Sequence, residues 1–197
     1  MPGPGTNRRE RRKAQTRQAL ADHALRLFLE RGFDAVTVAE VADAADVAVS
    51  TLFAYFSSKE SLVFPDDEAI EAQLVSAVRD RPAGVGLLEA LRELFLAHDA
   101  TPAPELVELV GRTPALVQHL ERTWARYADA LADEIAEHTG RHPDDVRVRA
   151  LARYVVLVPS VTRTSKNRRR AINDVFTALR NGWGDLDRAP GRARTEP

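Results

Sequence analysis

Two short helical patterns joined by a tight turn begin at Thr37, and they constrain the fold more than any other part of the chain. The Thr37 hydroxyl can accept a hydrogen bond from a backbone N–H two or three residues on, and Glu40 completes a capping box. The turn is predicted at Asp46 and Val47, and the second helix at residues 49–55. A helix of about two turns is marginal alone, so packing must hold it. The pattern indicates a helix-turn-helix.

The second helix is predicted to have a buried face and an exposed face. At helical spacing, Val47, Leu52 and Phe56 are expected to point inward. An exposed Phe and Tyr on a short helix, close to a Lys, suit a surface that contacts a partner. The residues expected to point outward are Val49, Ser50, Thr51, Phe53 and Tyr55.

An extended run of residues around this motif resembles the N-terminal signature of the TetR family of transcriptional regulators. The resemblance spans about 47 residues in order and spacing. It implies a DNA-binding regulator with a small N-terminal helical domain and a larger C-terminal one. It rests on Thr16-Arg17, Ala24, Leu27-Phe28, Gly32-Phe33, Thr37-Val38, Val41-Ala42, Ala45, Val47, Thr51-Leu52-Phe53, Tyr55-Phe56, Ser58-Lys59-Glu60 and Leu62.

Three positions depart from the family pattern. Asp46 and Ser50 stand where Gly is common, and Phe53 stands where Tyr is common. Asp tolerates left-handed backbone geometry better than most residues, so the turn can still form. Phe53 lacks a hydroxyl that in the family often contacts a phosphate. These departures leave open an alternative function, a ligand-binding or protein-interaction module with a degenerate DNA-reading unit.

Positive charge is concentrated just before the motif, although the net charge of the chain is −1. A basic cluster can neutralise phosphates or enter a minor groove, and a solvated, disordered leader is the alternative. We expect the N-terminal arginines and Lys59 to contact mainly phosphates, and Thr51 and Tyr55 to lie near the DNA backbone or the bases. The predicted DNA-binding residues are Arg8, Arg9, Arg12, Arg17, Thr37, Val49, Ser50, Thr51, Phe53, Tyr55 and Lys59.

The remaining chain predicts further helices separated by Pro and Gly breaks, and no strand. The fold class is all-α with about nine helices. After a disordered leader at residues 1–6, the helix-turn-helix domain spans 7–63. A helical effector-binding and dimerisation domain spans 64–186, followed by a disordered tail at 187–197. Pro159 is expected to kink one helix or end it early.

The resemblance implies an effector cavity in the larger domain. Apolar and aromatic walls with a few polar groups are typical of small-molecule pockets, although the same residues would also serve as plain core. The sequence of the predicted corner at residues 112–116 resembles that of a subgroup of the family whose members bind acyl-CoA-like ligands. The candidate ligand-binding residues are Phe95, Leu106, Val110, Arg112, Leu116, His119, Leu120, Trp124 and Tyr127.

The last two predicted helices carry more apolar surface than one partner needs, which suits a self-complementary four-helix dimer contact. The candidate interface residues are Leu151, Tyr154, Val155, Val158, Ile172, Val175, Phe176 and Leu179. Two such subunits would place their reading helices in successive major grooves of a palindromic operator in double-stranded DNA.

Several classes of protein are excluded or disfavoured. The chain has no cysteine, which excludes disulfides and thiolate catalysis. No apolar run is long enough to span a membrane, so a cytoplasmic protein is expected. His138 and His142 are four residues apart, but Gly140 and Pro143 predict a helix end between them, so no metal site is expected. No catalytic motif is present, and neither an enzyme nor a cofactor is predicted. The favoured function is a homodimeric repressor released by a small apolar or amphipathic effector.

Overall fold

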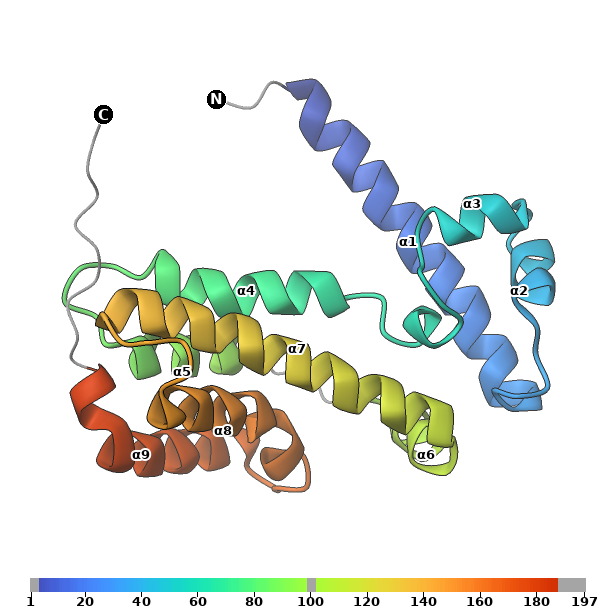
Figure 1. Ribbon diagram of the computed structural model, residues 1–197. Coiled ribbons are helices and arrows are strands. Elements are labelled where there is room, and N and C mark those ends of the chain that lie inside the picture. The colour runs from blue at the N-terminus through green and yellow to red at the C-terminus, as the bar shows by residue number, and fades with distance from the viewer. Residues whose placement is uncertain (1–3, 99–101, 188–197) are drawn as a thin grey trace. The chain divides into compact units, whose positions relative to one another are not determined.

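The computed structural model describes the backbone of residues 4–98 and 102–187, and the side chains of residues 8, 11–98 and 102–184. Within these ranges the chain forms nine α-helices, one short 3-10 helix and no strand (Figure 1). The predicted all-α class is confirmed. The elements are α1 (Pro4–Arg31), α2 (Val38–Ala44), α3 (Val49–Phe53), η1 (Glu60–Leu62), α4 (Asp67–Arg79), α5 (Leu87–Ala97), α6 (Pro104–Arg112), α7 (Pro114–Thr139), α8 (Val146–Thr162) and α9 (Arg168–Asp187).

The ends of α1 and α7 have a local cause. Gly32 and Gly140 adopt positive φ directly after α1 and α7, where a left-handed residue ends a helix. Of the two predicted effects of Pro159, an early end of the helix is contradicted, since α8 continues to Thr162. Val158 and Thr162 are fully buried on either side of this proline, and the Thr162 hydroxyl donates to the Val158 carbonyl at 2.8 Å. In the described part of the chain, no helix combines the length and apolarity required to cross a bilayer.

The described residues divide into two compact units, and the division differs from the predicted one. The N-terminal unit comprises Met1–Asp67 together with Pro102–Leu120, and the C-terminal unit comprises Glu68–Thr101 and Glu121–Pro197. The first unit therefore includes α6 and the first turns of α7, which we had predicted to belong to the second domain. Leu109 of α6 and Leu116 of α7 are buried in the core of this unit, which explains the difference.

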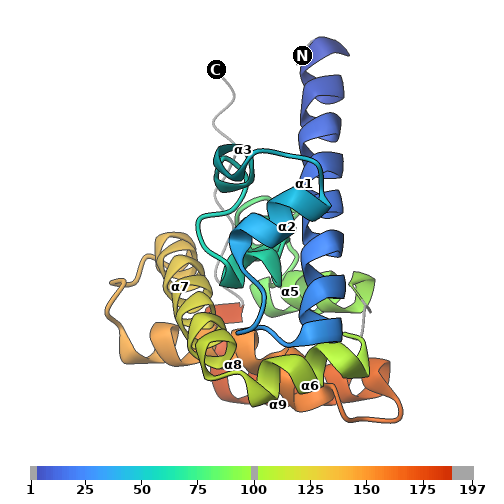
Figure 2. The same ribbon diagram turned by 90° about the vertical axis from the view of Figure 1, so that its right-hand side faces the viewer.

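The N-terminal unit is built on α1, whose apolar stripe packs against α2, η1 and α6 (Figure 2). The rings of Phe28 and Phe33 lie 5.0 Å apart between centroids in its centre. Full burial of a large apolar side chain such as these contributes about 1.5–3 kcal/mol to folding stability. The other fully buried members of this core include Leu20, Ala24, Val41, Ala42, Leu52, Leu62 and Leu116.

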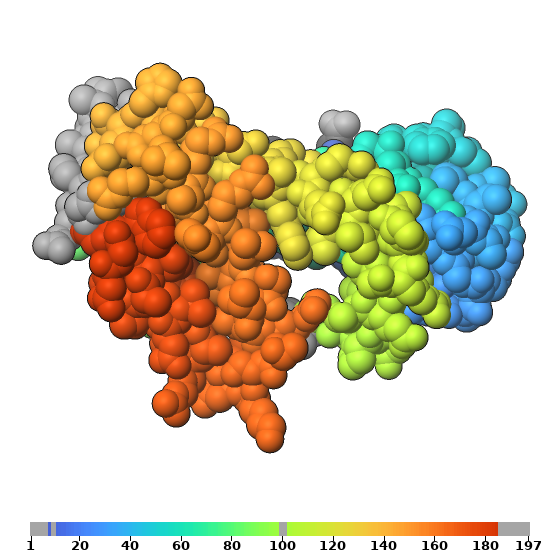
Figure 3. Space-filling view, turned by 60° about the horizontal axis from the view of Figure 1, so that its bottom comes forward, coloured from blue at the N-terminus to red at the C-terminus, as the bar shows by residue number. Residues whose placement is uncertain are grey.

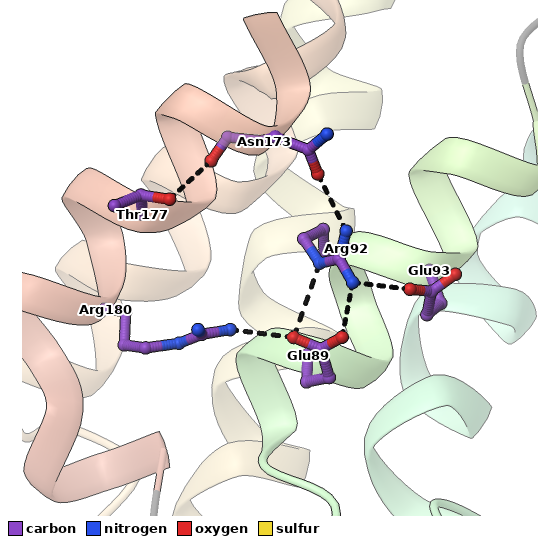
Figure 4. Close-up of polar contacts among 6 residues, drawn as sticks. All are labelled: Glu89, Arg92, Glu93, Asn173, Thr177 and Arg180. Carbon is purple, nitrogen blue, oxygen red and sulfur yellow. Dashed lines mark hydrogen bonds and ion pairs between the residues drawn. The ribbon is translucent and has the colours of Figure 1, made fainter. Parts of the chain in front are cut away.

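In the C-terminal unit, α9 packs against α5 and α8, and Figure 3 shows the surfaces of α8 (orange) and α9 (red) side by side. Polar contacts also join α5 to α9 (Figure 4). Arg92 donates to Asn173 at 2.7 Å and pairs with Glu89, which also receives Arg180 at 2.8 Å. Hydrogen bonding from Arg92, and then from Arg180, lowers the pKa of Glu89. Ion pairs at a surface add little energy, so buried apolar contacts dominate this packing.

A buried carboxylate lies on α7 in the same unit. Glu134 and His138 are both more than nine-tenths buried, with His138 Nδ1 3.1 Å from Glu134 Oε1. The same Nδ1 also lies 3.1 Å from the Glu134 carbonyl, and Glu134 Oε1 makes no hydrogen bond to any described residue. Burial raises the pKa of Glu134, and proximity to His138 opposes this increase. An ionised Glu134 therefore costs folding stability.

We predict that Glu134→Gln stabilises the protein at neutral pH. A carboxyl whose folded-state pKa is raised is harmless while it is protonated, and its penalty develops as the pH rises above its unfolded pKa. A neutral amide removes this penalty. We expect a gain of about 1 kcal/mol at pH 7.5, which corresponds to an increase in Tm of about 2–4 °C. The gain should disappear near pH 4, as measured by thermal unfolding across pH. Asp133→Asn, on an exposed neighbour, is the control and should change Tm at neither pH; an equal gain at both pH values for Glu134→Gln would contradict the ionisation argument.

Candidate nucleic-acid interface

The first helix of the motif, α2, begins with the predicted capping box. The Thr37 hydroxyl accepts from the Glu40 backbone N–H at 3.2 Å, and the Glu40 carboxylate accepts from the Thr37 N–H at 2.8 Å. Arg31 donates to the same carboxylate at 2.7 Å. The Thr37 backbone hydrogen bond, followed by that of Arg31, lowers the pKa of Glu40 to about 2. The Thr37 hydroxyl also donates to Glu40, so it is used within the protein, although we had predicted it as a DNA contact.

The turn between α2 and α3 adopts the geometry that favours glycine. Asp46 has a φ of 53°, the one positive φ at a described residue other than glycine. Its N–H donates to the Asp43 carbonyl at 3.1 Å, and the Val47 N–H donates to the Ala42 carbonyl at 3.0 Å. These hydrogen bonds terminate α2 and set the start of α3. Asp is among the residues that tolerate this conformation, so the turn forms without glycine.

The reading helix α3 spans Val49–Phe53 and is shorter than the predicted 49–55, because the chain turns at Ala54. Leu52 is fully buried, and Phe56 just after the helix is 1% exposed. These two side chains hold one face of α3 in the core, as predicted. On the other face, Val49 is 38% exposed and Phe53 is 51% exposed, and Ser50 and Thr51 are also exposed. Tyr55, predicted to point outward, is half-buried against the core.

Lys59 does not point toward solvent, as a phosphate ligand would. Its ammonium donates to the Phe33 carbonyl at 2.5 Å and lies 4.2 Å from the centre of the Phe33 ring. The Phe28 ring is 5.6 Å away. Burial lowers the pKa of this ammonium. Lys59 therefore stabilises the chain just beyond the end of α1, which corrects the predicted phosphate contact.

Arg17 is also used within the protein. Its guanidinium donates to the Pro65 carbonyl at 2.7 Å and to the Tyr55 carbonyl, and it lies 4.5 Å from the centre of the Phe56 ring. These contacts connect α1 to the segment that follows α3. Arg17 was predicted to bind DNA, but its fork of donors is directed toward backbone carbonyls.

Exposed positive charge is found on α1. Arg8 and Arg12 are exposed, as are Arg11 and Lys13. The side chain of Arg9, also predicted to bind DNA, lies outside the described residues. Four exposed cations thus lie on one helix, and positive charge of this kind attracts phosphates.

Comparison with known families identifies this arrangement. Residues 20–64 match the family model described as bacterial regulatory proteins of the TetR family, and residues 82–185 match the model of the MftR C-terminal domain. The second match alone covers more than half of the chain. The chain belongs to the TetR family.

Individual relatives agree with this assignment. The HTH-type transcriptional regulator TcmR of Streptomyces glaucescens is 33% identical over 155 residues, which cover 73% of this chain and 68% of TcmR. MftR of Mycobacterium tuberculosis is 28% identical, over 76% of this chain and 78% of MftR. A solved structure of FadR from Thermus thermophilus in complex with lauroyl-CoA has the same fold. It has a TM-score of 0.50 and 22% identity, covering 92% of this chain and 98% of FadR. The protein is a DNA-binding transcriptional regulator of the TetR family and not an enzyme.

The residues predicted to bind an effector do not all belong to one unit of this TetR-family protein. Phe95, Trp124 and Tyr127 pack in or against the core of the C-terminal unit. The remaining six, Leu106, Val110, Arg112, Leu116, His119 and Leu120, belong to the N-terminal unit. The predicted effector cavity stays a prediction.

The polar candidates among these six have partners within the N-terminal unit. The ring of His119 stacks on Phe64, with centroids 5.5 Å apart, and its Nε2 lies 3.4 Å from Asp67. Arg112 is exposed and lies 4.0 Å from Glu108. Leu116 is fully buried in the core around α1, so it acts as packing within the N-terminal unit.

The predicted dimer residues are mostly inaccessible. Leu151, Val155, Val158, Ile172, Phe176 and Leu179 are buried in the core of their own C-terminal unit, which corrects their assignment to a contact between subunits. Val175 is half-buried, and Tyr154 is 54% exposed. The exposed apolar residues of α8 that sequence reasoning missed are Val146, Leu157 and Val161. In chain order, Val146, Tyr154, Leu157 and Val161 are separated by eight, three and four residues. This spacing places all four on one face of the helix.

We predict that Lys59→Met destabilises the protein without changing the salt dependence of DNA binding. Methionine keeps the apolar stem but leaves the Phe33 carbonyl without its donor, at a cost of about 1–2 kcal/mol. Thermal unfolding should show a lower Tm, while the slope of log Kobs against log[salt] stays unchanged. Lys13→Met, on an exposed lysine of α1, is the matched control and should leave Tm unchanged. A flattened salt slope in Lys59→Met would show that Lys59 contacts phosphate.

Proposed function

We propose that this TetR-family regulator is a homodimeric repressor that binds a palindromic operator and is released by a small apolar or amphipathic effector. The observation that carries the proposal is the arrangement of α3, whose inner face is anchored by Leu52 while Val49 and Phe53 project outward. Exposed cations on α1 of the same unit supply attraction to the DNA backbone. Acting on genomic DNA would place the protein in the cytoplasm. A gel shift with the DNA flanking its own gene tests the proposal, since a degenerate reader would retain DNA weakly and without sequence preference.

The exposed stripe on α8 supports the homodimer. Val146, Tyr154, Leu157 and Val161 are exposed apolar side chains on one face of a helix whose other side is held in its own core. Contiguous exposed apolar surface marks an interaction site, and a self-complementary contact about a two-fold axis uses the same patch twice. A dimer of this kind can place two copies of α3 in successive major grooves, about 34–36 Å apart.

The position of α6 and the first turns of α7 supports effector control. Leu109 and Leu116 share one core with α1, so a shift of α6 or α7 is felt directly by the helix that supports α3. An effector that binds better to a form with altered spacing of the two α3 helices lowers DNA affinity by that preference. An acyl-CoA-like effector is proposed because FadR, which shares the fold, was solved with lauroyl-CoA. Arg112 and His119 are the polar candidates for its headgroup.

We predict that neutralising two cations on α1 weakens binding to all DNA sequences alike. In Arg8→Gln/Arg12→Gln, two fewer counterions are released on binding, so the slope of log Kobs against log[salt] should become shallower by about 2. Fluorescence anisotropy with a random-sequence duplex across a salt series measures this slope. Arg163→Gln, on an exposed arginine of the C-terminal unit, is the control and should leave the slope unchanged. An unchanged slope in the double variant would exclude these two arginines from phosphate contact.

We predict that two acidic residues in the α8 stripe convert the dimer into a monomer. Tyr154→Glu/Val161→Glu places charges on the surface that a second subunit would cover, and unpaired buried charges are costly. Sedimentation velocity should show a shift from the dimer mass to the monomer mass. Lys166→Glu, an equally acidic change at an exposed position, should remain a dimer. A double variant that is still dimeric would rule out this face as the interface.

A further inference from the structure

The helix-turn-helix segment has an unusual composition for a surface that reads DNA. Residues 33–58 contain no Lys, Arg, His, Asn or Gln. They contain four acids, Asp34, Glu40, Asp43 and Asp46. Lys59, directly after the motif, and Arg17 of α1 are directed toward backbone carbonyls of the protein. Arg31, at the end of α1, donates to Glu40 at 2.7 Å. Phosphate attraction therefore has to come from elsewhere in the unit, and base recognition has to proceed without these side chains.

This composition excludes the bidentate modes of base readout from α2 and α3. Arg or Lys recognises guanine through O6 and N7, and Asn or Gln recognises adenine through N6 and N7. None of these side chains is available anywhere in the motif. The remaining base contacts open to α3 are single hydrogen bonds from hydroxyls and apolar contacts.

The outer face of α3 is apolar and rigidly held. Val49 and Phe53 are four residues apart, so their side chains are neighbours on one face. Ser50 and Thr51 beside them are exposed, and Ala54 after the helix is exposed and small. Leu52, fully buried, fixes the opposite face. The major groove offers one apolar group to such a surface, the C5 methyl of thymine.

We propose that α3 reads its operator mainly through thymine methyl groups, which Phe53 and Val49 contact in the major groove. This inference rests on the proposed function and specifies the class of DNA sequence that it takes. Ser50 and Thr51 add hydroxyl hydrogen bonds, which either base of a pair can accept or donate, so they discriminate little between bases. The operator half-site contains two or more thymines at the positions that α3 covers, and the loss of their methyl groups weakens binding.

The first experiment selects binding sites from a randomised duplex library and then removes the methyl groups. The enriched duplex is compared with versions in which single thymidines are replaced by deoxyuridine, which retains all hydrogen-bonding groups. Each methyl that α3 contacts should contribute about fourfold in Kd, given about 0.8 kcal/mol for each buried methyl-sized group. Deoxyuridine outside the conserved half-site positions is the DNA control and should have no effect.

The second experiment assigns the methyl contact to Phe53 by a double-mutant cycle. In Phe53→Ala, the deoxyuridine substitution at the position of contact should no longer change Kd, because the side chain that contacted the methyl group is absent. Leu29→Ala is the matched protein control, since Leu29 is a similarly exposed apolar residue on α1. It should retain the full fourfold effect of deoxyuridine. Circular dichroism on both variants checks that the helices remain folded.

The outcomes separate this inference from the proposed function. Enrichment of a defined half-site whose affinity is indifferent to deoxyuridine would overturn methyl readout and leave the regulator intact. A deoxyuridine effect that is the same in Phe53→Ala, Val49→Ala and the parent protein would also overturn it, because neither side chain would then contact a methyl. A library that yields no enriched sequence would overturn the proposed function itself, and methyl readout with it.

Discussion

The DNA-reading surface depends on the burial of Leu52 and Phe56. A helix as short as α3 forms only one turn and would not persist in water, so its orientation is set by these two side chains in the core beside α1. Lys59 and Arg17 reinforce the same packing, because each directs its positive charge to backbone carbonyls flanking the motif. Two cations that could have met phosphates are used instead to hold α3 in place.

The consequence is a separation between affinity and sequence recognition. Exposed cations lie on α1, whereas the segment from residue 33 to residue 58 carries only acids among its charged residues. Attraction to phosphates is independent of sequence, and contacts to base edges specify it. Under the proposed function, these two contributions come from different helices of this chain. Changes on α1 should then alter how strongly DNA is held, and changes on α3 should alter which DNA is held.

Local features of the fold were predictable, and the use of individual side chains was not. The capping box at Thr37, the turn at Asp46 and the helix end at Gly140 were correctly predicted because each depends on neighbouring residues alone. The destinations of Lys59 and Arg17 depend on carbonyls 26 and 48 residues away, which periodicity does not reveal. On α8, the most apolar face was assigned to the dimer, but that face is buried in its own unit. The proposed interface therefore uses the other face of α8, where Tyr154 and Val161 are exposed.

The membership of α6 in the N-terminal unit changes how the proposed control by an effector would operate. If α6 belonged to the second domain, a signal would have to cross a boundary between domains before reaching α3. Leu109 and Leu116 instead lie in the core that holds α1 and Leu52. Close-packed cores transmit displacements because they contain few voids to absorb them. A movement of α6 therefore takes place inside the N-terminal unit, and α3 can respond to it through the core that both helices share.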